Sequence, residues 1–76
     1  MGVTYKKLWI MLIERNLSKT ELREMADISP ATLTKLNKNK YVHMEMLEKI
    51  CRALGCSFND IVELLPQVNK EETNDD

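Results

Sequence analysis

The amino-acid sequence predicts an all-α protein, a compact five-helix bundle built as one small domain. With 76 residues, 43% of them hydrophobic, the chain has enough apolar side chains for a single core, which would bury about 60% of the surface exposed by the unfolded chain. Apolar residues recur at helical spacing, and potential helix-capping residues interrupt them four times. No segment alternates apolar and polar residues as a half-buried strand does, so we expect no β-sheet.

The first predicted helix covers residues 3–15. Tyr5, Leu8 and Leu12 recur at helical spacing, and Trp9 lies beside this stripe, where we expect it to pack against neighbouring side chains. Asn16 readily adopts the left-handed backbone conformation that ends many helices. We therefore place the end of this helix at residue 15.

The second and third predicted helices cover residues 19–26 and 30–38. Each begins with an apolar staple and capping residues that span the helix start, which satisfy free backbone N–H groups and fix the direction in which the chain enters the helix. These residues are Leu17, Ser18, Glu21 and Leu22 for the second helix, and Ile28, Ser29, Pro30 and Leu33 for the third. Only residues 27–29 separate the two helices, and so short a connection forces the sharp crossing of a helix-turn-helix.

The fourth and fifth predicted helices cover residues 44–54 and 58–65. Gly55 ends the fourth, since glycine takes the left-handed conformation without steric cost. Staple and capping residues again span the start of each helix: Val42, His43 and Leu47 for the fourth, and Cys56, Ser57, Asp60 and Ile61 for the fifth. For His43, a plain capping or surface role is the simplest interpretation.

Residues 66–76 differ in composition from the rest of the chain. They begin with Pro66, contain one lysine and four acidic residues, and show no apolar periodicity. We expect a disordered acidic tail that follows a folded domain of residues 1–65. Without these residues the chain has 10 basic and 8 acidic side chains, so the net charge changes from −1 to +2.

The composition argues against several classes of protein. Cys51, Cys56 and His43 are the only cysteines and histidine, and they cannot supply a four-ligand zinc site without several carboxylates. We interpret the cysteines as packing thiols in a reducing compartment, although a disulfide between them is geometrically conceivable. No nucleophile with a base and no glycine-rich phosphate loop is present, so we expect neither an enzyme nor a cofactor.

The chain also lacks the apolar segments of membrane and secreted proteins. The longest apolar run, residues 8–13, is too short to cross a bilayer, and no small-residue cleavage site follows it. We expect a cytoplasmic protein that binds neither a membrane nor an evident small-molecule ligand.

The segment LSKTELREMADISPATLTKLNKNK, residues 17–40, resembles the DNA-binding domain of Cro and the phage repressors, the xenobiotic-response-element family. LEKICRALGCSFNDIVEL, residues 47–64, is similar to the fourth and fifth helices of that family. The resemblance implies a lambda-repressor-like fold for residues 1–65 and a role as a sequence-specific transcriptional regulator, a repressor. Family members often carry glutamine at the position of Lys19, a small residue at Arg23 and glycine at Asp27.

The window from residue 28 to residue 44 contains no acidic side chain, although the net charge of the whole chain is −1. Helical spacing places Leu33 and Leu36 on the buried side of the third helix. The opposite side then carries Ala31, Thr34, Lys35 and Lys38, with Thr32 at its margin. A carboxylate on a surface that approaches DNA would repel the phosphates. We therefore interpret the window as the DNA-binding face.

We expect two kinds of contact from this face. Lys35 can donate to the N7 and O6 atoms of guanine, while Ala31 and Thr34 can pack against a thymine methyl group. The resemblance implies the same readout positions, and it implies backbone contacts at the start of the second helix and in the loop after the third. The candidates for backbone contact are Lys19, Thr32, Lys38, Asn39, Lys40 and His43.

A domain that reads three or four base pairs cannot select a genomic site alone, so we expect a homodimer on a pseudo-palindromic operator of double-stranded DNA. The resemblance favours an interface near the C-terminal helix, formed by Phe58, Val62, Leu64 and Leu65. Ile10 and Met11 of the first helix are the alternative.

Two other functions are open at this point. The helices could bind another protein, as in an antitoxin or an anti-repressor partner. Nonspecific coating of nucleic acid would require far more positive charge than +2.

Overall fold

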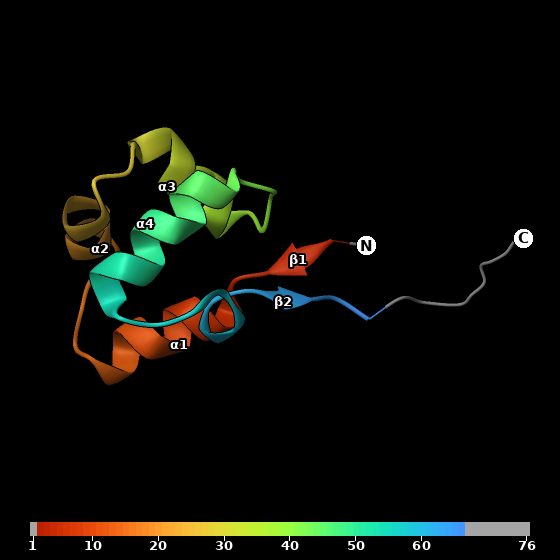
Figure 1. Cartoon of the computed structure of the whole chain (residues 1–76), viewed down its shortest axis with the longest axis horizontal. Helices are drawn as coiled ribbons and strands as arrows, with labels where there is room; N and C mark the ends of the chain where they lie inside the picture. The colour runs from red at the N-terminus through yellow and green to blue at the C-terminus, as the bar shows by residue number, and fades with distance from the viewer. Residues whose placement is uncertain (1, 67–76) are drawn as a thin grey trace, which may run out of the picture.

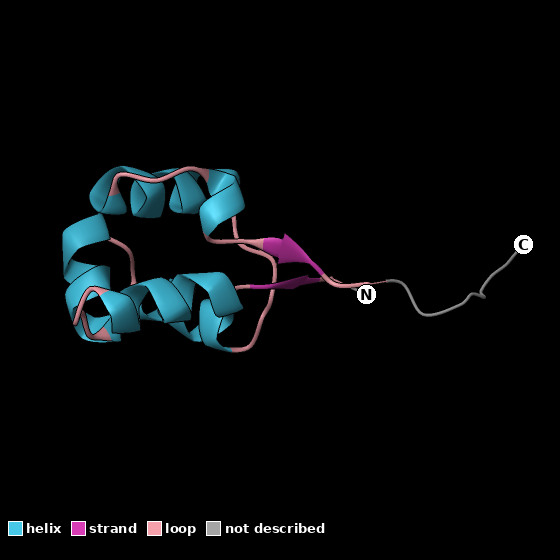
Figure 2. Cartoon of the chain, turned by 90° about the horizontal axis from the view of Figure 1, so that it is seen from below, coloured by secondary structure: helices cyan, strands magenta, loops and turns pink. Residues whose placement is uncertain are grey.

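The computed structural model of the protein describes residues 2–66. Four α-helices form the body of the molecule, and a small antiparallel sheet extends from one end of it (Figures 1 and 2). In chain order the elements are β1 (Val3–Thr4), α1 (Lys6–Glu14), α2 (Lys19–Ala26), α3 (Pro30–Asn37), α4 (Met44–Leu54), a 3-10 helix (Phe58–Asp60) and β2 (Glu63–Leu64). Of the predicted acidic tail, residues 67–76 lie outside the described residues.

The prediction of five helices without a sheet is wrong at both ends of the domain. Residues 3 and 4 do not begin α1 but pair with β2, Val3 opposite Leu64 and Thr4 opposite Glu63. The backbone N–H of Leu65 donates to the carbonyl oxygen of Gly2 at 2.9 Å, which extends this pairing. Two-residue strands are too short to show alternation in the sequence, and their pairing joins the two ends of the domain.

The predicted fifth helix is reduced to the 3-10 helix Phe58–Asp60. Asp60 Oδ2 accepts hydrogen bonds from the backbone N–H and the hydroxyl of Ser57, at 2.9 and 3.1 Å, so the turn begins as predicted. It does not continue as an α-helix, because residues 63 and 64 instead form β2 and pair with β1.

The central helices begin and end close to the predicted positions. The bounds of α2 and α4 agree with the prediction, and α3 ends one residue earlier, at Asn37. Ser18 and Glu21 form the predicted capping box, with hydrogen bonds of 3.0 and 2.8 Å between each side chain and the other's backbone N–H. Gly55 adopts the left-handed conformation after α4.

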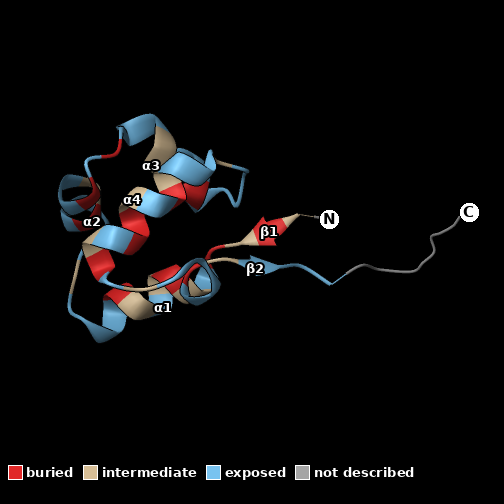
Figure 3. Ribbon diagram, viewed as in Figure 1, coloured by how far each residue is buried: buried red, intermediate tan, exposed pale blue. Residues whose placement is uncertain are grey.

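The core lies between the helices and contains fully buried side chains from all four α-helices, from the residue before α1 and from the residue after the 3-10 helix (Figure 3). The largest of these side chains are Tyr5, Leu8, Leu22, Leu36, Ile50 and Ile61. A guanidinium N–H of Arg15 donates to the carbonyl oxygen of Leu54 at 2.6 Å, which ties the end of α1 to the end of α4. Among residues 2–66, no helix is long and apolar enough to cross a membrane.

Candidate nucleic-acid interface

The turn between α2 and α3 fixes how α3 is presented. Asp27 adopts the left-handed conformation, with φ 56° and ψ 50°, at the position where the family often has glycine. Ile28 is buried inside the corner, and the ammonium group of Lys49 donates to the carbonyl oxygen of Asp27 at 3.4 Å. Ser29 Oγ then accepts from the backbone N–H of Thr32 at 3.1 Å and caps α3. The corner is therefore held from inside by packing and from outside by hydrogen bonds.

Helix α3 lies at the surface and is anchored by one side only (Figure 3). Leu36 is fully buried and Leu33 is half-buried, as the helical spacing predicted. Ala31, Thr34 and Lys35 are exposed, and their spacing of three and four residues makes them neighbours on the helix surface. The structure thus brings the three predicted base-reading residues together on one accessible patch.

Two threonines of α3 already use their hydroxyl groups within the helix. Thr34 Oγ1 donates to the carbonyl oxygen of Pro30 at 3.0 Å, so Thr34 offers a partner its methyl group and an acceptor oxygen rather than a donor. That chemistry suits the predicted contact with a thymine methyl group. Thr32 Oγ1 lies 3.1 Å from Ser29 Oγ, and Thr32 is half-buried beside the cap.

Lys19 lies at a junction of three helices. Its ammonium group donates to Asn37 Oδ1 at 2.6 Å and lies 4.2 Å from the centroid of the Trp9 ring. Trp9 comes from α1, Lys19 from the start of α2, and Asn37 from the end of α3. An ammonium group has three N–H donors, so Lys19 can still contact a phosphate while these partners hold it in place. Sequence reasoning identified Lys19 but missed Asn37, because no local pattern links residues 18 positions apart.

The loop after α3 is fastened to the beginning of the chain. Asn39, with φ 55°, accepts a hydrogen bond from the backbone N–H of Tyr5 through Oδ1 at 3.1 Å. The buried Tyr5 hydroxyl donates to the carbonyl oxygen of Lys40 at 2.7 Å, and burial raises the pKa of this hydroxyl. Lys38 and Lys40 are exposed on this anchored loop. Asn39 therefore has a structural role, and only its side-chain NH2 group is left to meet a phosphate.

His43 precedes α4 and is exposed, but its side chain makes no capping hydrogen bond. The first backbone N–H groups of α4 are therefore not capped by that side chain. Tyr41, whose side chain is 71% exposed next to Lys40, was not singled out from the sequence. It is the one exposed aromatic side chain of the acid-free window, residues 28–44.

The residues predicted for a dimer interface divide into two groups. Leu64 in β2 is 81% exposed, and Leu65, which follows β2, is 40% exposed. Among residues 2–66, β2 has a strand partner on one side only. Phe58 lies on the 3-10 helix beside α4, and Val62 is half-buried against the core. On α1, the alternative surface, Ile10 is 44% exposed and Met11 is half-buried.

Comparisons with known proteins agree with this geometry. Residues 7–67 match the family of Cro/C1-type HTH DNA-binding domains. The chain is 43% identical over 56 residues to the uncharacterized HTH-type transcriptional regulator YozG of Bacillus subtilis (strain 168), an alignment that covers 71% of this chain and 67% of YozG.

A solved structure is also similar. The transcriptional regulator VanUg is 47% identical in sequence and superposes with a TM-score of 0.83, covering 87% of this chain and 88% of VanUg. A tight α2–α3 corner, an exposed and acid-free α3, and these matches lead to one assignment. The chain belongs to the Cro/C1-type helix-turn-helix family of DNA-binding transcriptional regulators.

Proposed function

We propose that this regulator is a sequence-specific repressor that places α3 in the major groove of its operator. The observation that carries the proposal is the exposed patch of Ala31, Thr34 and Lys35 on a helix whose orientation is fixed by the capped corner before it. A helix presented in this way can reach base edges with the exposed side chains of this patch. The absence of acidic residues from 28 to 44 supports the same orientation towards DNA.

Base reading and backbone binding are assigned to different residues. Lys35 donates to guanine, and Ala31 and Thr34 pack against a thymine methyl group. Lys38 and Lys40 bind phosphates from the anchored loop, while Lys19 binds the backbone from the start of α2. Further backbone contacts come from Thr32, from the side-chain NH2 group of Asn39 and from the N-terminal end of α4 at His43.

We further propose that two copies pair through β2. The exposed side of Leu64 and the free edge of β2 suit antiparallel pairing with a second β2, which would join two small sheets into one. Such a dimer reads two half-sites whose centres lie about 34 Å, or one helical turn, apart. A dimer bound over a promoter in the cytoplasm would repress by excluding RNA polymerase.

Selection of bound sequences from random duplex DNA tests the proposal. It should be done at about 0.15 M salt, where nonspecific dissociation constants are about 10⁻⁴ to 10⁻⁶ M. Enrichment of an inverted repeat with half-sites about one turn apart is the expected result. Folded protein that enriches no sequence would contradict sequence-specific binding and would favour a protein-interaction role for the same helices.

A further inference from the structure

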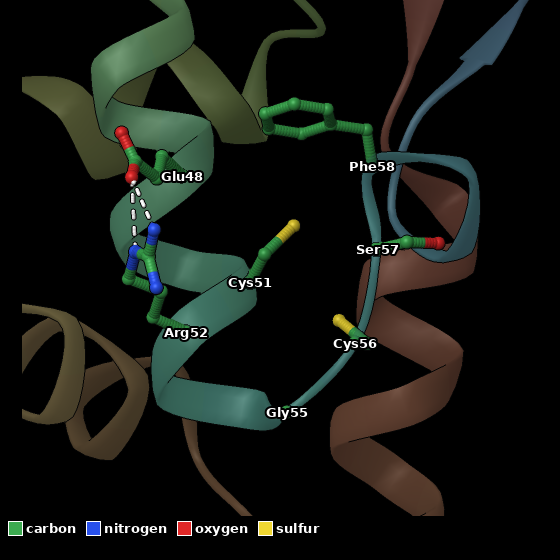
Figure 4. Close-up of a pocket in the computed structure, with 7 residues that line it drawn as sticks. All are labelled: Glu48, Cys51, Arg52, Gly55, Cys56, Ser57 and Phe58. Carbon is green, nitrogen blue, oxygen red and sulfur yellow. Dashed lines mark hydrogen bonds and ion pairs between the residues drawn. The ribbon is translucent and has the colours of Figure 1, made fainter.

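A cavity of about 570 Å³ lies between the end of α4 and the segment that follows it, away from the α3 patch (Figure 4). Its lining contains both cysteines of the chain. The lining residues are Glu48, Cys51, Arg52, Gly55, Cys56, Ser57 and Phe58. Figure 4 shows the sulfur atoms of Cys51 and Cys56 projecting into the same space from opposite walls, with the Phe58 ring reaching across it towards α4.

The way α4 ends brings these two thiols together. Gly55 has φ 67°, and the backbone N–H of Cys56 donates to the carbonyl oxygen of Cys51 at 3.0 Å. Helix ends of this kind commonly bring the residues at the two ends of that hydrogen bond into side-chain contact, usually an apolar one. Here both positions are cysteines, so the backbone itself holds a dithiol.

The two thiols have different surroundings. Cys51 is buried and Cys56 is half-buried, so the pair is reached from solvent through Cys56. Burial, followed by the proximity of Cys56, raises the pKa of the Cys51 thiol to about 11. Neither sulfur atom is in a disulfide, so both thiols can react with a ligand that displaces their protons.

Other potential ligands near the thiols do not complete a larger metal site. Glu48 is engaged in an ion pair with Arg52, with 2.8 Å between oxygen and nitrogen. Within residues 2–66, no group of three or more His, Cys, Asp or Glu side chains is arranged to hold a metal ion. Zinc, which takes four such ligands in structural sites, does not fit this arrangement. A soft ion that needs only two sulfur ligands does fit the two thiols.

We propose that Cys51 and Cys56 form a dithiol site that binds soft, thiophilic ions through two sulfur ligands, with trivalent arsenic carrying one organic group as the representative ligand. Phenylarsine oxide is the probe. Its arsenic forms one bond to each sulfur, and its oxygen leaves as water with the two thiol protons, so no atom changes oxidation state. The cavity beside the sulfurs offers room for the phenyl group near Phe58.

The test is titration of the reduced full-length chain with phenylarsine oxide, followed by intact mass and by protection of the thiols from alkylation. We expect one arsenical per chain, with both thiols protected together. Cys56→Ser and Cys51→Ser should each weaken binding by about 100-fold or more, because the second sulfur–arsenic bond gains from effective concentration. Glu48→Gln is the matched control, since it changes the same lining but removes no sulfur and should leave binding unchanged.

Several results would overturn the proposal. Two arsenicals per chain would mean that the thiols react independently, and binding of the wild type no tighter than that of Cys56→Ser would mean that no chelate forms. Circular dichroism monitors the fold of each variant. Should Cys51→Ser unfold, because Cys51 is part of the core, the comparison with Cys56→Ser is sufficient, since Cys56 lies nearer the surface.

Discussion

At the scale of single residues, the candidate interface depends on side chains that are held in position before DNA arrives. Lys19 is the clearest case, because the Trp9 ring and Asn37 Oδ1 already restrict its side chain, which would otherwise lose rotamer freedom in the proposed contact with the DNA backbone. Tyr5 has a comparable effect on the lysine-bearing loop through its two hydrogen bonds to Asn39 and Lys40. Preorganisation of this kind would lower the entropic cost of each proposed phosphate contact.

Substitution of Lys19 tests its assignment to the DNA backbone. Lys19→Met keeps an apolar stem against Trp9 but removes the charge. We expect it to weaken binding to specific and random DNA alike and to reduce the slope of log K against log salt by about 0.9. The binding constant should be measured by fluorescence anisotropy over a series of salt concentrations.

Lys7→Met is the matched control, because it removes the same charge from a lysine that lies near Asp60 rather than on α2 or α3. An unchanged salt slope in Lys19→Met would show that Lys19 only joins the three helices.

At the scale of secondary-structure elements, the local signals in the sequence account for the helix-turn-helix. Ser18, Ser29 and Gly55 act on backbone groups within a few residues of themselves, so their effects could be predicted without knowledge of the fold. The sheet could not be predicted, because Val3 and Leu64 meet only after the helices have packed. Asn37 and Tyr5 were not predicted as supports of the interface for the same reason. The partner of Asn37 lies 18 residues away in the sequence, and the partners of Tyr5 lie 34 and 35 residues away.

The cap of α2 gives a stability prediction at this scale. Ser18→Ala removes the acceptor for the backbone N–H of Glu21, and we expect the free energy of unfolding to fall by about 1 kcal/mol. For a domain of this size that loss corresponds to a decrease in Tm of about 4–8 °C. Thermal unfolding followed by circular dichroism measures it.

Ser18→Gly is the comparison, because glycine is tolerated at this position and should cost only a few tenths of a kcal/mol. Equal stability of the wild type and Ser18→Ala would show that the capping box does not determine where α2 begins.

At the scale of the whole molecule, charge is distributed unevenly over a chain that is acidic overall. The net charge is −1, yet α3 and the loop after it carry three lysines and no acid, and residues 66–76 carry four of the twelve acidic side chains. For the proposed approach of α3 to DNA, the local distribution of charge therefore matters more than the net charge. The sheet that joins the two ends of the described domain adds a second feature of this scale, an edge of β2 that has no strand partner among residues 2–66.

The β2 edge gives the prediction for assembly. Leu64→Asp replaces the most exposed large apolar side chain of the described residues with a charged one. Because Leu64 is not part of the core, the substitution should leave the fold intact. We expect the dimer to dissociate at least about tenfold more readily, a change of about 1.4 kcal/mol, while Tm measured on the monomer stays within experimental error. Sedimentation equilibrium at several concentrations measures the association.

Ile10→Asp on α1 is the control, because it introduces the same charge on another exposed apolar position. Dissociation caused by Ile10→Asp and not by Leu64→Asp would place the interface on α1.

The central claim is that the exposed side of α3 reads bases while the loop after it binds only the backbone. The most direct measurement repeats the selection from random duplex DNA with Lys35→Ala and Lys40→Ala beside the wild type. We predict that Lys35→Ala relaxes the preference at one or two positions in each half-site, a loss of about 1–3 kcal/mol of discrimination, whereas Lys40→Ala yields the wild-type sequence with weaker binding. An unchanged sequence preference in Lys35→Ala would contradict the placement of this helix face against the bases.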